Sequence, residues 1–169
     1  RIEKPKIAIN PDAYELYLKG KHKYEKREFA DDSEIAIEML KKAIELDDNL
    51  IACKHFLGST YIKDGEWEKA MQLFTSSLKK AEEFNDKIWI GRSTRKIGNS
   101  FFKKGDKEKA LENWEKSLEI AEEIDDKIGL SGSLNNIGYI FFNQKKYDMA
   151  IEYFNKSLLI NEELGDKSS

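Results

Sequence analysis

A forty-residue period is the feature of this sequence that most constrains its fold, because residues 87–126 recur almost place for place in residues 127–166. The residues that return unchanged forty positions later are Lys87, Ile88, Ser93, Ile97, Gly98, Phe101, Phe102, Ala110, Glu112, Lys116, Ser117, Leu118, Ile120, Glu122, Glu123 and Asp126. Residues 47–86 form a looser copy that keeps Gly58, Tyr61, Gly65, Ala70, Phe74, Ser77 and Leu78 at corresponding places. A fixed period of this length predicts stacked repeats, in which each repeat contacts only its neighbours.

The composition excludes several classes of partner. Charged residues make up 36% of the chain, yet the net charge is only −3, whereas a nucleic-acid-binding surface needs a net basic stripe. No apolar run approaches the roughly 18 residues that a membrane span requires. We therefore expect neither nucleic acid nor membrane as a partner. The single cysteine, Cys53, precludes an internal disulfide, so we expect a cytoplasmic location.

Both ends of the sequence resemble cuts in a longer protein. The chain does not begin with Met, and Leu164 to Lys167 match Ile124 to Lys127, the place where one repeat passes into the next. We therefore expect residues 167–169 to start a further repeat. An exposed apolar side on residues 147–164 would then predict self-association through the last helix.

Apolar residues fall at three- and four-residue spacing throughout, which predicts an all-α chain. Eight helices are expected, at about 12–25, 33–46, 49–63, 66–84, 87–103, 107–124, 127–144 and 147–164. They form four antiparallel hairpins, assigned to residues 11–48, 49–86, 87–126 and 127–166, after a linker over residues 1–10. The first hairpin is irregular, because an insertion around residues 28–32 lengthens its turn.

Within each hairpin the smallest side chains mark the closest approach of the two helices. Gly98 and Ala110 are the expected contact in residues 87–126, with Trp114 filling the space beside them. Aspartates at 48, 86, 126 and 166 stand just before the next helix, where we expect them to cap its free N–H groups.

These residues resemble the tetratricopeptide repeat family. Its pattern is Leu-Gly, an aromatic residue three places on, a polar or Gly turn, and then Ala, an aromatic residue and a small residue. The third repeat has Ile97, Gly98, Phe101, Gly105, Ala110, Trp114 and Ser117, and the second and fourth repeats follow it. The first repeat keeps Gly20 and Ala36 but has Lys19 and Lys23 in place of the Leu and the aromatic residue. The three later repeats resemble the longer, roughly forty-residue variety of the family.

The resemblance implies an α-α superhelix whose concave groove, lined by the first helix of each repeat, binds a peptide. The principal groove residues that the resemblance implies are Lys21, His55, Ser59, Lys63, Arg92, Arg95, Asn99, Phe102, Lys103, Asn135, Tyr139, Phe142 and Asn143. Further ligand-contacting positions of the family fall on Tyr14, Tyr17, Tyr24, Glu25 and Ile62.

The chemistry of this set favours a peptide with acidic side chains or a free C-terminal carboxylate. Arginine binds carboxylates in a bidentate manner, asparagine pairs with extended backbone, and Phe102 and Phe142 supply apolar surface. The alternative is that Arg92, Arg95 and Lys103 only solvate an exposed helix.

A second hypothesis makes the chain a regulatory or oligomerising part of a larger bacterial signalling enzyme, a nucleotide cyclase or kinase, or of a transcription regulator. It rests on residues 10–20, which resemble the openings of repeat arrays in such proteins.

No motif points to catalysis, a metal or a cofactor. Cys53 stands where the family prefers a small buried residue, and His22 is expected to pack between helices. The recurring pair Glu122-Glu123 is typical of a solvated helix end rather than an acid/base pair. We therefore expect a non-enzymatic interaction scaffold.

Overall fold

The computed structural model describes residues 9–26, 28–29 and 31–166. Those residues form eight α-helices and no strand: α1 (Pro11–Glu25), α2 (Asp32–Leu46), α3 (Ile51–Lys63), α4 (Trp67–Glu83), α5 (Lys87–Lys104), α6 (Lys107–Ile124), α7 (Lys127–Asn143) and α8 (Tyr147–Asp166). Every predicted helix is present, with ends within two residues of the prediction. Most of the predicted linker over residues 1–10, and the continuation over residues 167–169, lie outside the described residues.

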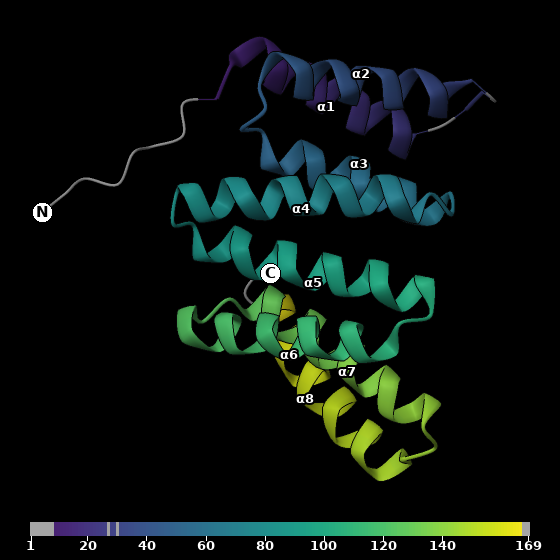
Figure 1. Ribbon diagram of the computed structural model, residues 1–169, viewed down its shortest axis with the longest axis vertical. Helices are drawn as coiled ribbons and strands as arrows, with labels where there is room; N and C mark the ends of the chain where they lie inside the picture. Colours follow the sequence, from purple (N-terminus) through teal and green to yellow (C-terminus); the bar gives the residue numbers. More distant parts are fainter. Residues whose placement is uncertain (1–8, 27, 30, 167–169) are drawn as a thin grey trace, which may run out of the picture. The chain divides into compact units, whose positions relative to one another are not determined.

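The helices pair in sequence order, which confirms the predicted hairpins. The chain divides into one unit over residues 1–84 and another over residues 85–169. The first unit holds the hairpins α1–α2 and α3–α4, and the second holds α5–α6 and α7–α8 (Figure 1). No helix of the described chain has the length and apolar character that crossing a membrane would need.

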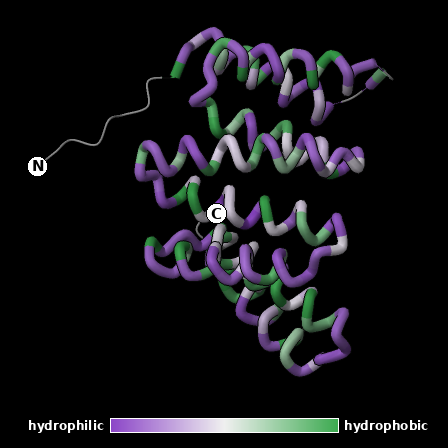
Figure 2. Tube along the Cα trace, viewed as in Figure 1, coloured by the Kyte–Doolittle hydropathy of each residue, from purple (hydrophilic) through white to green (hydrophobic). Residues whose placement is uncertain are grey.

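Apolar residues are interspersed with polar residues along the helices (Figure 2). Each unit has its own apolar core, formed by the positions that the helical spacing places on one side of each helix. The core of the first unit consists of the buried residues Ala13, Leu40, Ala43, Leu50, Cys53 and Leu57. In the second unit, Ala110, Trp114, Ile137 and Ile140 are buried, and Leu111 and Leu118 pack against them.

The predicted contact between Gly98 and the second helix of its hairpin is confirmed. A Cβ placed on Gly98 would lie 2.7 Å from Trp114 Cδ1 and 3.1 Å from the carbonyl oxygen of Ala110. The indole of Trp114 fills the space beside the glycine, as expected, and its Nε1 donates to the carbonyl oxygen of Arg95 at 3.1 Å. A side chain at position 98 would therefore separate α5 from α6.

The helix ends follow local sequence chemistry, although not every predicted cap forms. Asn10 caps α1 by accepting from the N–H groups of Asp12 and Ala13, and Asp86 caps α5 by accepting from the N–H of Trp89. Asp126 makes no such hydrogen bond at the start of α7, and Asp48 is not the residue at the cap of α3. The cap prediction is wrong at both, because each carboxylate pairs instead with a basic side chain: Asp126 with Arg92 and Asp48 with Lys54. The side chain of Asp166 lies outside the described residues.

The lengthened turn of the first hairpin is organised by the Asp32 carboxylate. Its Oδ1 lies 2.6 Å from Lys23 Nζ, and its Oδ2 accepts from the backbone N–H groups of Glu28 at 2.9 Å and Phe29 at 3.0 Å. The hydrogen bond from Lys23, followed by those from the Phe29 and Glu28 backbone, lowers the pKa of Asp32 to about 2 against the opposing effect of burial.

This carboxylate should contribute to the acid sensitivity of the fold. An unfolded aspartate has a pKa of about 3.9, so the stabilisation by Asp32 is complete above about pH 4 and is lost as the pH falls towards 2. We expect Asp32→Asn to be less stable than the parent at pH 7, with the difference shrinking between pH 4 and pH 2. Urea unfolding at several pH values measures this difference. Asp31→Asn, at the exposed neighbouring residue, is the matched control, and an equal effect there would contradict the prediction.

Candidate functional site

The structure places the predicted groove residues on the first helix of each hairpin. Lys21 lies on α1; His55, Ser59 and Lys63 lie on α3; Arg92, Arg95, Asn99, Phe102 and Lys103 lie on α5; and Asn135, Tyr139, Phe142 and Asn143 lie on α7. Within the first unit α1 and α3 carry them, and within the second unit α5 and α7 carry them.

In the first unit the predicted cations lie against aromatic rings. Lys21 Nζ is 5.9 Å from the centroid of the Phe56 ring, and Lys63 Nζ is 5.8 Å from that of Tyr24. Such contacts hold lysines over aromatic faces with modest energy. His55, in contrast, is buried and packs edge-on against Phe74 with 5.4 Å between ring centroids. His55 therefore supports the α3–α4 hairpin, while Ser59 is half-buried.

In the second unit Arg92 is engaged by a carboxylate of the protein itself. Its Nε and Nη2 donate to the two oxygens of Asp126 at 3.1 and 3.0 Å, a bidentate pair that joins α5 to the start of α7. Partial burial raises the pKa of Asp126, but the hydrogen bond and charge of Arg92 outweigh it and lower the pKa overall. Arg92 is thus a structural cation in this state.

Arg95, one helical turn further along α5, lacks such a partner. Its Nε is buried and has no hydrogen-bond partner among the described residues. Burial lowers the pKa of Arg95, the charge of Arg92 lowers it further, and only Asp126 acts in the opposite direction. A buried Nε without an acceptor is unfavourable, because no hydrogen bond compensates for its desolvation.

A glycine of α7 makes room for this guanidinium. A Cβ placed on Gly132 would lie 2.6 Å from Arg95 Nη1 and 2.8 Å from its Cζ. Sequence reasoning did not assign a role to Gly132, although a glycine inside a helix costs about 1 kcal/mol relative to alanine and so indicates a close approach. The first helices of the second unit therefore meet across Arg95 and Gly132.

Asn99 is occupied by contacts within the unit. Its Oδ1 accepts from Trp114 Nε1 at 2.8 Å and from Asn136 Nδ2 at 2.9 Å, which links α5 to α6 and α7. Because this oxygen positions the buried indole, replacing Asn99 would disturb packing as well as any ligand contact. Asn136, which the sequence did not single out, is a partner in this network.

An aromatic cluster formed by Phe102, Tyr139, Phe142 and Tyr147 continues the same side of α5 and α7. Tyr139 lies 5.5 Å from Phe102 and 6.4 Å from Phe142, and Phe142 lies 5.8 Å from Tyr147, measured between ring centroids. Tyr139, Phe142 and Tyr147 remain 47%, 51% and 53% exposed. Tyr147 was not among the predicted groove residues. The cluster is a solvent-facing apolar surface beside a half-buried cation.

The remaining predicted residues of this unit lie around the aromatic cluster. Lys103, Asn135 and Asn143 are exposed. Asn143 Nδ2 donates to the carbonyl oxygen of Tyr139 one turn earlier at 2.8 Å. They provide polar groups at the edge of the apolar surface.

The structure places Cys53 in the core and His22 at the surface. Burial raises the pKa of the Cys53 thiol to about 12, and that thiol donates to the Leu40 carbonyl oxygen, so it packs as predicted. His22 is exposed, so the prediction that it packs between helices is wrong. No group of three or more His, Cys, Asp or Glu side chains among the described residues could hold a metal ion.

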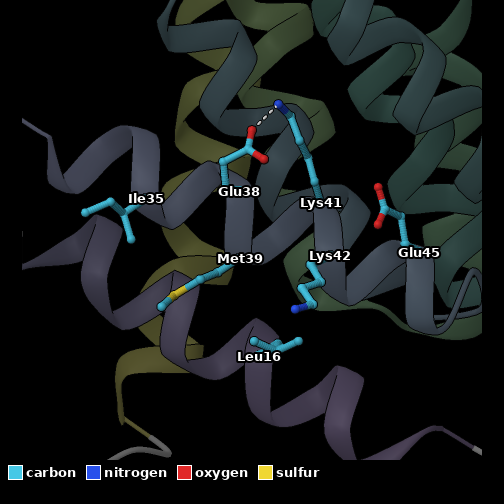
Figure 3. A pocket seen from close by; sticks show the side chains of 7 residues that line it. All are labelled: Leu16, Ile35, Glu38, Met39, Lys41, Lys42 and Glu45. Carbon is cyan, nitrogen blue, oxygen red and sulfur yellow. Dashed lines mark hydrogen bonds and ion pairs between the residues drawn. The ribbon is translucent and has the colours of Figure 1, made fainter.

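A shallow groove between α1 and α2 has a different character (Figure 3). Its apolar lining consists of Leu16, Ile35 and Met39, and its other lining residues are Glu38, Lys41, Lys42 and Glu45. Lys41 Nζ lies 2.5 Å from a Glu38 oxygen, the contact drawn in Figure 3. None of the predicted groove residues lines it, so the face of α5 and α7 is the better candidate site.

Helical hairpins that present one face of their first helices define a scaffold for interaction with other proteins. Tetratricopeptide repeat profiles match residues 132–164 and residues 50–127, together more than half of the chain. The chain therefore belongs to the tetratricopeptide repeat family, as its sequence pattern predicted. No curated protein matches it.

Solved structures with the same fold include proteins of several kinds. A crystal structure of MamA is 26% identical, with a TM-score of 0.61, over 93% of this chain and 83% of that chain. The N-terminal domain of stress-induced protein-1 from C. elegans is 22% identical, with a TM-score of 0.58, over 72% of this chain and 98% of that one. Aspartyl phosphate phosphatase F from Bacillus subtilis is 20% identical with a TM-score of 0.75, and the match covers 91% of this chain but only 41% of the phosphatase.

Proposed function

We propose that the chain binds a segment of another protein along α5 and α7, with an acidic side chain or a C-terminal carboxylate of that segment at Arg95. The observation that carries this proposal is the half-buried guanidinium of Arg95, whose buried Nε has no hydrogen-bond partner among the described residues. A ligand carboxylate would supply the negative charge that this half-buried guanidinium lacks. Arg92 does not supply the same site, because Asp126 already occupies its donors.

The aromatic cluster supports a second contact for the same segment. Arg95 and Phe102 lie seven residues apart on α5, which corresponds to about 10 Å along a helix at 1.5 Å per residue. An extended peptide covers that distance in about three residues at 3.3 Å each. The segment would therefore carry an apolar or aromatic side chain about three positions from its carboxylate.

Polar groups at the edge of the cluster would hold the backbone of the segment. The exposed amides of Asn135 and Asn143 can donate to and accept from an extended chain. Binding of this kind needs no catalysis or cofactor. The lone buried Cys53 supports a cytoplasmic location, where free thiols persist.

Peptide binding by calorimetry tests this function. We expect a peptide with a carboxylate three residues from an aromatic side chain to bind, and its Asn-for-Asp or C-terminally amidated counterpart to bind at least about tenfold more weakly. Arg95→Gln should weaken the acidic peptide about ten- to a hundredfold, because hydrogen bonds to charged groups contribute about 1.5–3 kcal/mol. Lys116→Gln, an exposed residue on α6, is the matched control.

Equal affinity for the acidic and neutral peptides, or an unchanged affinity in Arg95→Gln, would refute the carboxylate site. Asn99 is left intact in this test because it also holds Trp114. A pull-down from cell extract with the parent and with Arg95→Gln then identifies the natural partner as the protein lost in the variant.

A further inference from the structure

Gly132 of α7 differs from the glycines that pack the hairpins. Gly98 has a glycine at its place in every repeat, and in each the second helix of the hairpin packs on it. The place of Gly132 is taken by Tyr14, Ala52 and Arg92 in the first three repeats. The hairpin therefore accepts an aromatic, a small or a charged side chain there, and helix packing does not require a glycine.

The space beside Gly132 is filled by the end of the Arg95 side chain. The three atoms nearest to a Cβ placed on Gly132 are Arg95 Nη1 at 2.6 Å, Cζ at 2.8 Å and Nε at 3.1 Å. All three belong to the far end of a flexible side chain, and none belongs to the backbone. A methyl group at position 132 would therefore displace the guanidinium and leave α5 and α7 in place.

No hydrogen bond from Nε fixes the guanidinium of Arg95 in this position. The Arg95 Nε has no partner among the described residues, whereas Arg92, three residues earlier, donates to both oxygens of Asp126. The space left by Gly132 therefore determines how close the charge of Arg95 lies to α7.

We infer that Gly132 acts through Arg95 as a positioning residue for the ligand carboxylate, an inference that rests on the proposed function. Gly132 lets the guanidinium lie half-buried against α7, where it attracts a carboxylate more strongly than in water. Packing against α7 also restricts the side chain before the ligand arrives, which lowers the entropy cost of binding. Displaced into solvent, the guanidinium would lose both advantages.

Calorimetry and melting curves of Gly132→Ala test this role. We expect the affinity for the acidic peptide to fall about tenfold, because the displaced guanidinium must be ordered again on binding. The melting temperature should rise by about 2–4 °C, because alanine stabilises a helix relative to glycine and its methyl group meets only a side chain that can move. Gly165→Ala, in α8 with nothing within 4 Å of a placed Cβ, is the matched control and should not change the affinity.

A double variant shows whether Gly132 acts through Arg95. Once Arg95→Gln is present, Gly132→Ala should not weaken binding further, because the group that it displaces is gone. A further loss of affinity would mean that position 132 meets the ligand itself, and it would overturn the inference. An unchanged affinity in Gly132→Ala alone, or a fall in its melting temperature as a packing role requires, would also overturn it.

Nuclear magnetic resonance follows the guanidinium without any peptide. The Nε–H resonance of Arg95, assigned by its loss in Arg95→Gln, should shift in Gly132→Ala and not in Gly165→Ala. An unshifted resonance overturns the inference whatever the peptide does. An acidic peptide that the parent does not bind refutes the proposed function and, with it, the role of Gly132 in binding, while the resonance still decides whether Gly132 places Arg95.

Discussion

Gly98→Leu is expected to lower the free energy of unfolding by about 3 kcal/mol or more, which corresponds to a fall of about 10 °C in melting temperature for a chain of this size. Any Cβ at this position meets the Trp114 ring at 2.7 Å and the Ala110 carbonyl oxygen at 3.1 Å. The indole cannot move aside without losing its hydrogen bonds to Asn99 Oδ1 and the Arg95 carbonyl oxygen. Overpacking and lost hydrogen bonds therefore act together.

Gly98→Ala separates the steric effect from helix propensity. Alanine stabilises a helix by about 1 kcal/mol relative to glycine. Gly98→Ala would therefore raise the stability if position 98 made no contact outside its own helix. We expect a loss of about 1–2 kcal/mol instead, because the first carbon of the side chain already meets Trp114. Lys103→Leu, which adds leucine to an exposed position of the same helix, is the control and should change stability by less than about 0.5 kcal/mol. A melting temperature in Gly98→Leu equal to that of Lys103→Leu would contradict the assigned contact.

The fold was predictable because the residues that determine helix packing recur in several repeats. Gly98 and Trp114 recur as Gly58 with Phe74 and as Gly138 with Phe154, and the same close approach occurs in each hairpin. Agreement among the repeats of one chain gives the information that, for a single globular domain, an alignment of related sequences would give. Helix ends follow equally local rules, such as Asn10 before Pro11 and the left-handed Gly105.

The sequence predicts the positions of the candidate site, but the contacts that each side chain makes there depend on the fold. Sequence alone makes Arg92 and Arg95 equivalent groove cations, and Asp126 a helix cap. The two arginines differ in which of them reaches the carboxylate of Asp126, which is 34 residues from Arg92 in the sequence. The repeat pattern does not predict a contact between side chains so far apart in the chain. Likewise His55 and His22 occupy helix positions near the boundary between buried and exposed, and each lies on the other side of that boundary from its prediction.

Lys54 is the clearest case of a residue that the pattern left unassigned. Its counterparts are Thr94 and Leu134, so its position belongs to the interior, yet it carries a charge. The side chain is 1% exposed, and Nζ donates to Asp48 Oδ1 at 2.6 Å and Ser76 Oγ at 2.8 Å. Partial burial raises the pKa of Asp48, but the hydrogen bonds and charges of Lys54 and then Lys80 lower it overall. The pair holds the α2–α3 connection against α4.

Removing Asp48 and removing Lys54 should change the free energy of unfolding by different amounts. Asp48→Ala leaves the Lys54 charge buried without its counterion, and breaking a buried pair in this way costs about 3–5 kcal/mol. Because Asp48 itself is 59% exposed and water screens it, we expect about 2–3 kcal/mol. Lys54→Met removes the charge and keeps the length of the side chain, so it should be neutral or stabilising by about 1 kcal/mol.

Urea unfolding of the two single variants and the double variant measures the coupling. In Asp48→Ala combined with Lys54→Met no charge is left buried, so the double variant should match Lys54→Met rather than the sum of the two changes. Asp64→Ala, at the exposed end of α3, is the control and should change the free energy of unfolding by less than about 0.5 kcal/mol. If Lys54→Met lost as much stability as Asp48→Ala, the ion pair would be a net source of stability, and the desolvation of Lys54 would not be the dominant energy at this position.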